Sequence, residues 1–178
     1  MKLSINRDYF SLSESRGFTL IELLIIITVL AILATVVFVA LNPMARFQDA
    51  RNSRRWTDIN SIMGAIKLYQ VDHGGSYPGD IDTITEDQYY EIGSAASCSA
   101  DTCTLPGGAT LQADCLNFGT LVDNGYVPSL PIDPNAAGAS DTNTFYYFMK
   151  NSNKAITVGA CNAEKGSADA VPVISVSR

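Results

Sequence analysis

The chain has 178 residues and a formal net charge of −6 at pH 7. That length allows one ordinary domain, or a smaller domain with a long appendage. Its acidic residues are spread along the downstream chain, whereas phosphate binding needs a concentrated basic face, so we expect no nucleic-acid binding by the isolated chain.

The first predicted element is an apolar helix over residues 18–41, in which Glu22 is the one charged residue. As a helix this run would be about 36 Å long, enough to cross a bilayer core of roughly 30 Å. A secretory signal peptide is the alternative, but its apolar core would have only about 7 to 15 residues. The sequence therefore predicts a polar leader over residues 1–17 and a membrane-spanning helix over residues 18–41.

A second helical segment is predicted over residues 42–73. Pro43 lacks a backbone donor and clashes with the preceding turn, so we expect a kink or a locally melted turn near Asn42. Beyond it, apolar residues recur at three- and four-residue spacings: Trp56, Ile59, Met63, Ile66 and Tyr69 or Gln70. The residues between them are mainly polar: Arg51, Arg54, Arg55, Asp58 and Lys67. The pattern predicts an amphipathic helix that packs on a domain and stops at Gly74-Gly75.

Residues 74–178 are predicted to form a small globular head. Residues 74–106 are loop-rich, and residues 111–123 could form a short helix. Residues 144–150 and 155–161 are β-prone and read as a hairpin, with a third strand over residues 171–176. The aromatic residues Phe145, Tyr146, Tyr147 and Phe148 should alternate between the two faces of their strand. The predicted fold is α+β, with a long N-terminal helix laid on a small antiparallel sheet.

The four cysteines, Cys98, Cys103, Cys115 and Cys161, all lie beyond the apolar segment. An even number in a small domain after a membrane segment indicates disulfides in an oxidising, extracytoplasmic space, which places the C-terminal part outside. Zinc is the alternative interpretation, but the chain has one histidine and no Cys-x-x-Cys pair. Of the three possible pairings we favour Cys98–Cys103 and Cys115–Cys161.

The sequence predicts no enzyme, metal or cofactor. His73 stands alone at a predicted helix end, where a solvated capping role is favoured over catalysis. Residues 74–79 are glycine-rich but lack the Lys-Ser/Thr of a phosphate-binding loop, so they indicate a turn. Asp133 and Asp141 could offer oxygens to calcium, although their spacing matches no strict motif and a solvated loop is favoured. The arginines of residues 46–55 could contact anionic lipid or acidic neighbours, or form an ordinary solvated face.

The run Gly17-Phe18-Thr19-Leu20-Ile21-Glu22, which heads the apolar segment, resembles the class III signal of type IV pilins and type II secretion pseudopilins. In that family a prepilin peptidase cuts after the glycine, and the new N-terminal phenylalanine is N-methylated. The resemblance implies cleavage between Gly17 and Phe18 and methylation of Phe18. It also implies an assembly role for Glu22, whose carboxylate would attract the terminal amine of a neighbouring subunit, because a lipid-facing carboxylate is otherwise costly.

The resemblance extends more weakly into the head. Residues 68–72 with Tyr77-Pro78 are similar to the end of the long helix in major pseudopilins and Gram-positive-type pilins. Residues 130–134 and 145–147 resemble their loop before the sheet, which holds a structural calcium in major pseudopilins. The cysteines, and Asn135-Ala136 where major pseudopilins have Trp-Gly, favour a pilin over a pseudopilin.

The function expected from this resemblance is that of a structural subunit in a type IV pilus-like surface filament, serving attachment, motility or DNA uptake. The expected partners are other copies of the chain, prepilin peptidase, the pilus assembly machinery of the inner membrane, and the membrane itself before assembly. The chain would span the cytoplasmic membrane with its head outside, and then enter an extracellular filament. The alternatives are a pseudopilin of a type II secretion system, or a single-pass anchored extracytoplasmic binding domain.

Overall fold

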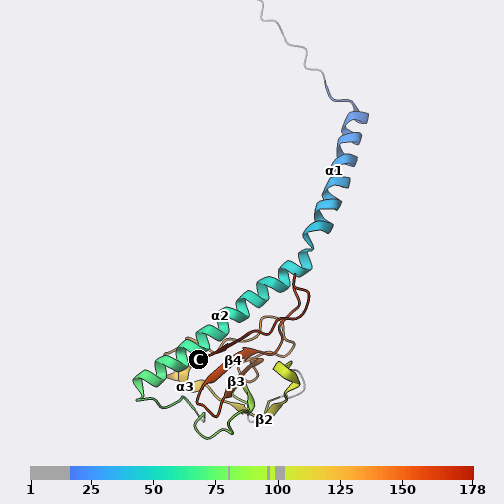
Figure 1. Ribbon diagram of the computed structural model, residues 1–178. Helices are drawn as coiled ribbons and strands as arrows, with labels where there is room; N and C mark the ends of the chain where they lie inside the picture. Colours follow the sequence, from blue (N-terminus) through green and yellow to red (C-terminus); the bar gives the residue numbers. More distant parts are fainter. Residues whose placement is uncertain (1–16, 80, 96, 99–102) are drawn as a thin grey trace, which may run out of the picture. The chain divides into compact units, whose positions relative to one another are not determined.

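The computed structural model describes residues 17–79, 81–95, 97–98 and 103–178 (Figure 1). The predicted leader therefore lies outside the described residues, apart from Gly17. The chain divides into two compact units, Met1–Asn42 and Pro43–Arg178, and each is treated separately below.

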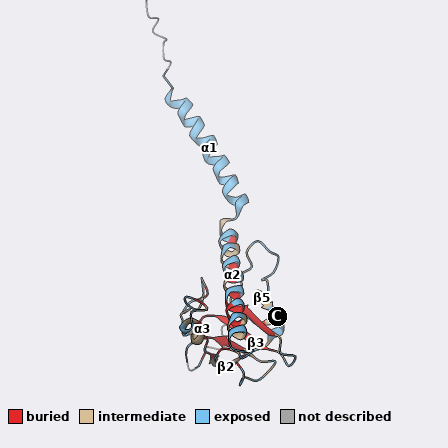
Figure 2. Ribbon diagram, turned by 90° about the vertical axis from the view of Figure 1, so that its left-hand side faces the viewer, coloured by how far each residue is buried: buried red, intermediate tan, exposed pale blue. Residues whose placement is uncertain are grey.

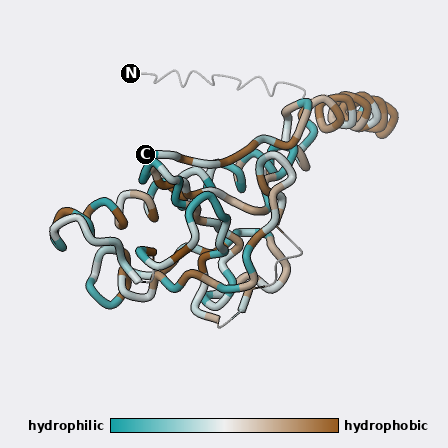
Figure 3. Tube along the Cα trace, turned by 60° about the horizontal axis from the view of Figure 1, so that its bottom comes forward, coloured by the Kyte–Doolittle hydropathy of each residue, from teal (hydrophilic) through white to brown (hydrophobic). Residues whose placement is uncertain are grey.

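The described part of the first unit is built around helix α1, Leu20–Leu41, which buries none of its residues (Figure 2). Its surface is apolar on all sides (Figure 3). The hydroxyls of Thr28 and Thr35 donate to the carbonyl oxygens of Ile25 and Ala31, each at 2.8 Å, so both are satisfied within the helix. Of the described residues, only the helical stretch Leu20–Asp72 is long and apolar enough to cross a membrane, judged by length and composition.

The helical path is interrupted at one residue, Asn42, as expected from the proline that follows it. Asn42 adopts the left-handed conformation with φ 41° and ψ 71°, and helix α2, Pro43–Asp72, begins at the next residue. A proline suits the first position of a helix, because the N–H that it lacks has no partner there. At the other end, Gly74 has a φ of 62° and the N–H of Gly75 donates to the carbonyl of Gln70 at 2.7 Å. This confirms the predicted glycine stop.

The head contains a five-stranded sheet in the order β2-β1-β3-β4-β5. Its strands are β1 Tyr89–Ile92, β2 Leu111–Leu116, β3 Tyr146–Lys150, β4 Ile156–Ala160 and β5 Ser175–Ser177. The predicted hairpin is confirmed, because β3 and β4 pair antiparallel from Tyr146↔Ala160 to Lys150↔Ile156. A 3₁₀ turn, Pro106–Gly108, precedes β2, and a short helix α3, Gly119–Asp123, follows it.

Four details of the predicted sheet are wrong. Strands β1 and β2 pair parallel, so the sheet is mixed; the long connection over residues 93–110 permits the crossover that parallel pairing needs. Residues 111–116 form a strand instead of the start of a helix, because pairing with β1 outweighs the local preference. The third strand is confined to β5, and β1 lies within the segment that was predicted as loop.

The main core lies between α2 and the sheet, where α2 contacts β4, β5 and α3 (Figure 1). As predicted, Ile59, Met63 and Ile66 of α2 are buried. Trp56 was also expected on this face but is 41% exposed. The predicted alternation of the aromatic residues 145–148 is confirmed, since Tyr146 and Phe148 join the main core whereas Phe145 and Tyr147 join a second cluster with Leu105 and Leu111.

All four cysteines form disulfides, but the pairing differs from the favoured one. The bonds are Cys98–Cys115, with Cα atoms 5.2 Å apart, and Cys103–Cys161, with Cα atoms 4.3 Å apart. The N–H of Cys98 donates to the carbonyl of Ala113 in β2 at 3.0 Å, which places this cysteine beside Cys115. The N–H of Thr104 donates to the carbonyl of Cys161 at 3.2 Å, which places Cys103 at the end of β4. The strands, and not proximity in the sequence, therefore decide the pairing.

Candidate functional site

The Gly17–Phe18 junction lies outside any helix, two residues before α1 begins at Leu20. Phe18 is 75% exposed. Thr19 is the N-cap of α1, with φ −81° and ψ 151°, and its hydroxyl oxygen accepts the backbone N–H of Glu22 at 3.2 Å. The peptide bond that the resemblance marks for cleavage is thus accessible.

Glu22 lies in the first turn of α1, where a carboxylate interacts favourably with the positive end of the helix dipole. Within the described residues its carboxylate forms no hydrogen bond or ion pair, so it is free to meet a group from another molecule. The expected contact with a neighbouring Phe18 is made between copies and stays a prediction.

The surface of α1 is an exposed apolar region. Large side chains along its whole length are exposed, from Leu20 to Leu41. Monomeric soluble proteins rarely expose continuous apolar patches of this extent, so this helix needs lipid or other protein around it. The structure thus brings together an accessible junction, a single unpaired carboxylate and a helix that requires a partner.

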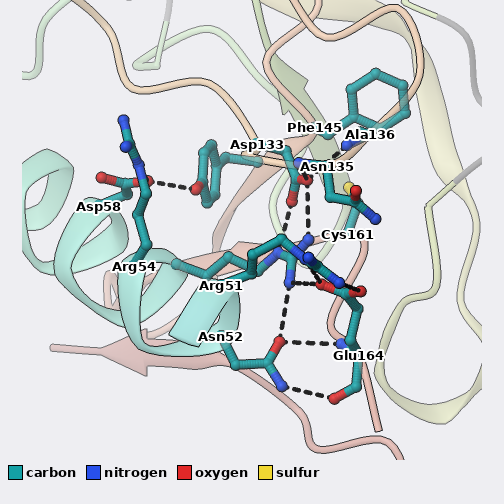
Figure 4. Close-up of polar contacts among 12 residues, drawn as sticks. Arg51, Asn52, Arg54, Asp58, Asp133, Asn135, Ala136, Phe145, Cys161 and Glu164 are labelled. Carbon is teal, nitrogen blue, oxygen red and sulfur yellow. Dashed lines mark hydrogen bonds and ion pairs between the residues drawn. The ribbon is translucent and has the colours of Figure 1, made fainter. Parts of the chain in front are cut away.

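A second group of charged residues lies on the buried face of α2 (Figure 4). Arg55 is completely buried; its Nε and Nη2 donate to the two carboxylate oxygens of Asp133 at 2.7 and 2.9 Å. Its Nη1 donates to Asn52 Oδ1 and to Glu164 Oε2, both at 2.9 Å. A bidentate pair of this kind is the arrangement in which an arginine binds a carboxylate most strongly.

Glu164 extends this cluster to the C-terminal part of the chain. Nε and Nη2 of Arg51 donate to its two carboxylate oxygens at 2.6 and 2.5 Å. The side chain of Asn52 forms two hydrogen bonds with the backbone of Glu164: it donates to the carbonyl at 2.6 Å and accepts from the N–H at 3.0 Å. The hydrogen bonds from Arg51, and less strongly that from Arg55, lower the pKa of the Glu164 carboxyl although burial acts in the opposite direction.

Residues 164–167, which we call the C-terminal strap, form two further hydrogen bonds with α2. The N–H of Gly166 donates to Gln48 Oε1, and the N–H of Ser167 donates to Asp49 Oδ1, each at 3.0 Å. The cluster contains two arginines, Arg51 and Arg55, and two carboxylates, Asp133 and Glu164, so its charges balance. Both guanidinium groups donate to these carboxylates. It therefore ties the first half of α2 to the strap and to the Asp133 loop.

This geometry corrects one interpretation of the sequence and gives the contacts of Asp133. The arginines of residues 46–55 do not share one solvated face: Arg55 is buried and Arg51 is bound to Glu164, whereas the side chains of Arg46 and Arg54 are 69% and 66% exposed. Asp133, considered for calcium, instead binds Arg55 and accepts the backbone N–H groups of residues 135 and 136 at 2.9 and 2.8 Å. Across the described ranges, no group of three or more His, Cys, Asp or Glu side chains could hold a metal ion.

Two other sequence candidates are placed as expected. His73 follows the last turn of α2 and stacks on Tyr69, with ring centroids 3.8 Å apart. Its Nδ1 lies 3.0 Å from the Tyr69 carbonyl oxygen, which fits a helix-end role. The glycine-rich residues 74–79 form turns in which Gly74, Gly75 and Gly79 have positive φ. Asp141, the other calcium candidate, lies beside Ser94, whose N–H donates to its backbone carbonyl at 3.1 Å.

Comparison with known proteins supports the resemblance both in the N-terminal motif and in the chain beyond it. A family described as "Prokaryotic N-terminal methylation motif" matches residues 12–38. The "Type II secretion system core protein G" of Klebsiella pneumoniae is 28% identical over 123 residues, which cover 69% of this chain and 71% of that protein. No solved structure matches the chain. The motif, the similar sequence beyond it, the exposed apolar helix and the α+β head all support the resemblance of the chain to type IV pilins and type II secretion pseudopilins.

Proposed function

We propose that this pilin-like chain is a structural subunit of a type IV pilus-like surface filament. The observation that carries the proposal is α1, an apolar helix with no buried residue and one charged side chain, headed by an accessible Gly17–Phe18 junction. Such a helix can be covered by lipid before assembly and by the same helix of other copies afterwards. The head would then face outward and give the filament its surface.

Processing comes first in the proposed sequence of events. Prepilin peptidase removes residues 1–17, and Phe18 becomes the N-terminus and is N-methylated. The match of residues 12–38 to the methylation motif supports this step, as does the position of the junction outside the helix. The apolar helix stays attached to the head, so the processed subunit remains in the cytoplasmic membrane with its disulfide-bonded head outside. Prepilin peptidase and the assembly machinery of the inner membrane are the partners at this stage.

Assembly would use Glu22. In the filament the carboxylate of an incoming copy would meet the Phe18 amine of its neighbour; at about 4 Å and an effective dielectric constant near 20 the attraction is about 4 kcal/mol. The cost of dehydrating both groups reduces this gain, so the pair matters more for recruitment and register than for final strength. Because each copy offers one amine and one carboxylate, the contact does not close and generates a helical filament.

A role in type II secretion is the second candidate. The relative in Klebsiella pneumoniae carries that system in its name, and its similarity extends well beyond the N-terminal motif. In that case the same α1 packing would build a short secretion fibre. The two disulfides favour a pilus, because major pseudopilins generally lack such cysteines.

The experiment is to shear the surface of cells that express the chain, image the released material and determine the N-terminal mass of the subunit. We expect filaments whose subunit begins at N-methylated Phe18. A mature protein that begins upstream of Gly17, or that is cut after the apolar run, would overturn the proposal. Deleting the gene separates the two candidates: loss of surface filaments with normal secretion supports a pilus, and loss of a secreted protein from cells without filaments supports the pseudopilin.

A further inference from the structure

The start of α1 is fixed by the side chain of Thr19. Its hydroxyl oxygen accepts the N–H of Glu22 at 3.2 Å, while its carbonyl accepts the N–H of Leu23, also at 3.2 Å. The backbone of Thr19 is extended, so the helix begins only at Leu20. An N-cap of this kind satisfies one of the backbone donors that a helix leaves free at its first turn.

We propose that Thr19 is a positioning residue for processing, because its cap keeps the Gly17–Phe18 bond out of α1. The inference rests on the proposed function, which supplies the cleavage. The reaction is a hydrolysis: water adds across the amide, the C–N bond breaks, and the products are a Gly17 carboxylate and a Phe18 amine. If α1 extended further upstream, the carbonyl of Gly17 would accept the N–H of Ile21 within the helix. That carbonyl, which the attacking water must reach, would then be bonded and shielded.

The sequence upstream makes this extension possible once the cap is lost. Gly17 is itself an acceptable N-cap, ranking with threonine, so a helix without the Thr19 hydroxyl can begin at Phe18. Within the described residues, no other side chain caps this helix. Thr19-x-x-Glu22 has the pattern of a capping box, in which the glutamate would bond back to the Thr19 N–H. Among the contacts of the described residues only the threonine half is formed. Thr19 therefore sets the start of the helix alone, and the Glu22 carboxylate stays free for assembly.

The test compares the cleavage rates of full-length variants, reconstituted in detergent with purified prepilin peptidase. Thr19→Val keeps the branched shape and removes the hydroxyl, and we expect initial leader removal to slow about fivefold, the factor that a typical cap contributes. Thr19→Ser and Thr19→Asn both restore a capping oxygen and should stay within about twofold of the wild type. Thr28→Val makes the same change in the middle of α1, where the hydroxyl bonds to Ile25, and should have no effect.

Asparagine is the decisive variant, because it restores the cap without resembling threonine. If Thr19→Asn were as slow as Thr19→Val, the peptidase would be reading the threonine itself, and the inference would fall. It would also fall if Thr19→Val were cleaved at the wild-type rate, or if its Gly17 carbonyl kept the wild-type ¹³C chemical shift instead of moving to a helical value. A wild-type chain that is not cleaved at all would overturn the proposed function as well, which distinguishes the two failures.

Discussion

Helices α1 and α2 follow each other with one residue between them, yet they are stabilised in opposite ways. The 22 residues of α1 bury nothing, whereas the 30 residues of α2 bury a set that includes the charged side chain of Arg55. In α2 the apolar side chains contact the sheet, and disulfides and a buried ion cluster hold the segments around it. For α1 the apolar contacts must come from lipid or from other protein. We therefore expect that membrane insertion and assembly can be changed by mutation without changing the stability of the head.

The largest effect is expected at Glu22. Glu22→Ala should reduce filament numbers about tenfold or more, because losing only about 1.4 kcal/mol of pairing free energy has that consequence. Membrane insertion and cleavage after Gly17 should persist, and the head should unfold as in the wild type. Filaments are counted by electron microscopy at matched protein levels, with Thr28→Val as the control that removes a polar group from the same helix. Normal filament numbers in Glu22→Ala cells would show that the carboxylate does not direct assembly.

At Arg55 we expect the head to lose stability while membrane insertion stays normal. Arg55→Met leaves the buried carboxylate of Asp133 without its cation, and losses of this kind are about 3–5 kcal/mol in the free energy of unfolding. Denaturant titration of the full chain in detergent measures this change, and insertion of α1 should be unaffected. Arg54→Met is the matched control, since Arg54 is exposed and contacts Asp58 only at 3.8 Å; we expect a change within about 0.5 kcal/mol. Equal effects of the two variants would contradict the role assigned to the buried cluster.

Both disulfides lie in the head, so removing either should lower the free energy of unfolding of the head and leave α1 unchanged. By the chain-entropy model, removing Cys103–Cys161, with a sequence separation of 58, costs about 4 kcal/mol. Removing Cys98–Cys115, with a separation of 17, costs about 3 kcal/mol. Unfolding of the double-serine variants measures both, and peptide mapping without reductant checks the pairing. A peptide that links Cys98 to Cys103 would contradict the structure.

The smallest expected effect is the pH dependence of the strap. Because the arginines lower the pKa of Glu164 below its ordinary value of 4.5, its contribution is complete above that pH and is lost as the pH falls through the lowered value. Burial raises the pKa values of Asp58 and Glu91, so these two groups act in the opposite direction. Glu164→Gln should therefore lose about 1.5 kcal/mol at neutral pH, and the difference from the wild type should shrink as the pH falls below 4.5. A difference that stays constant with pH would assign the effect to packing.

The proposed processing and assembly site could be predicted from the sequence because its signals are local. The junction, the cap and Glu22 fall within six consecutive residues, and the apolar run that they head is long enough to indicate a membrane span by itself. The buried face of α2 was predicted in part, since Ile59, Met63 and Ile66 repeat at helical spacing. A signal for Arg55 was also present: positions 55, 59, 62 and 66 form one stripe, and a charged residue on a buried stripe requires a partner.

The partners themselves could not be predicted. Asp133 and Glu164 are 78 and 109 residues from Arg55 in the sequence, and only the folded sheet brings them together. The same applies to the disulfides, whose pairing depends on strand β2, and to β1, which is too short to stand out without its neighbours. Long-range register, and not local preference, decided each of these cases.

The C-terminal strap also has a mechanical consequence. Any pull on α1 enters the head at Pro43 and passes first along the part of α2 that the strap holds. Gln48, Asp49, Arg51 and Asn52 each bond a residue of the strap, so the load is divided among several contacts along the helix axis. Contacts loaded in parallel must fail together, whereas contacts loaded in series can open one at a time. The strap thus attaches the head to α2 at the end where a pull on α1 would arrive.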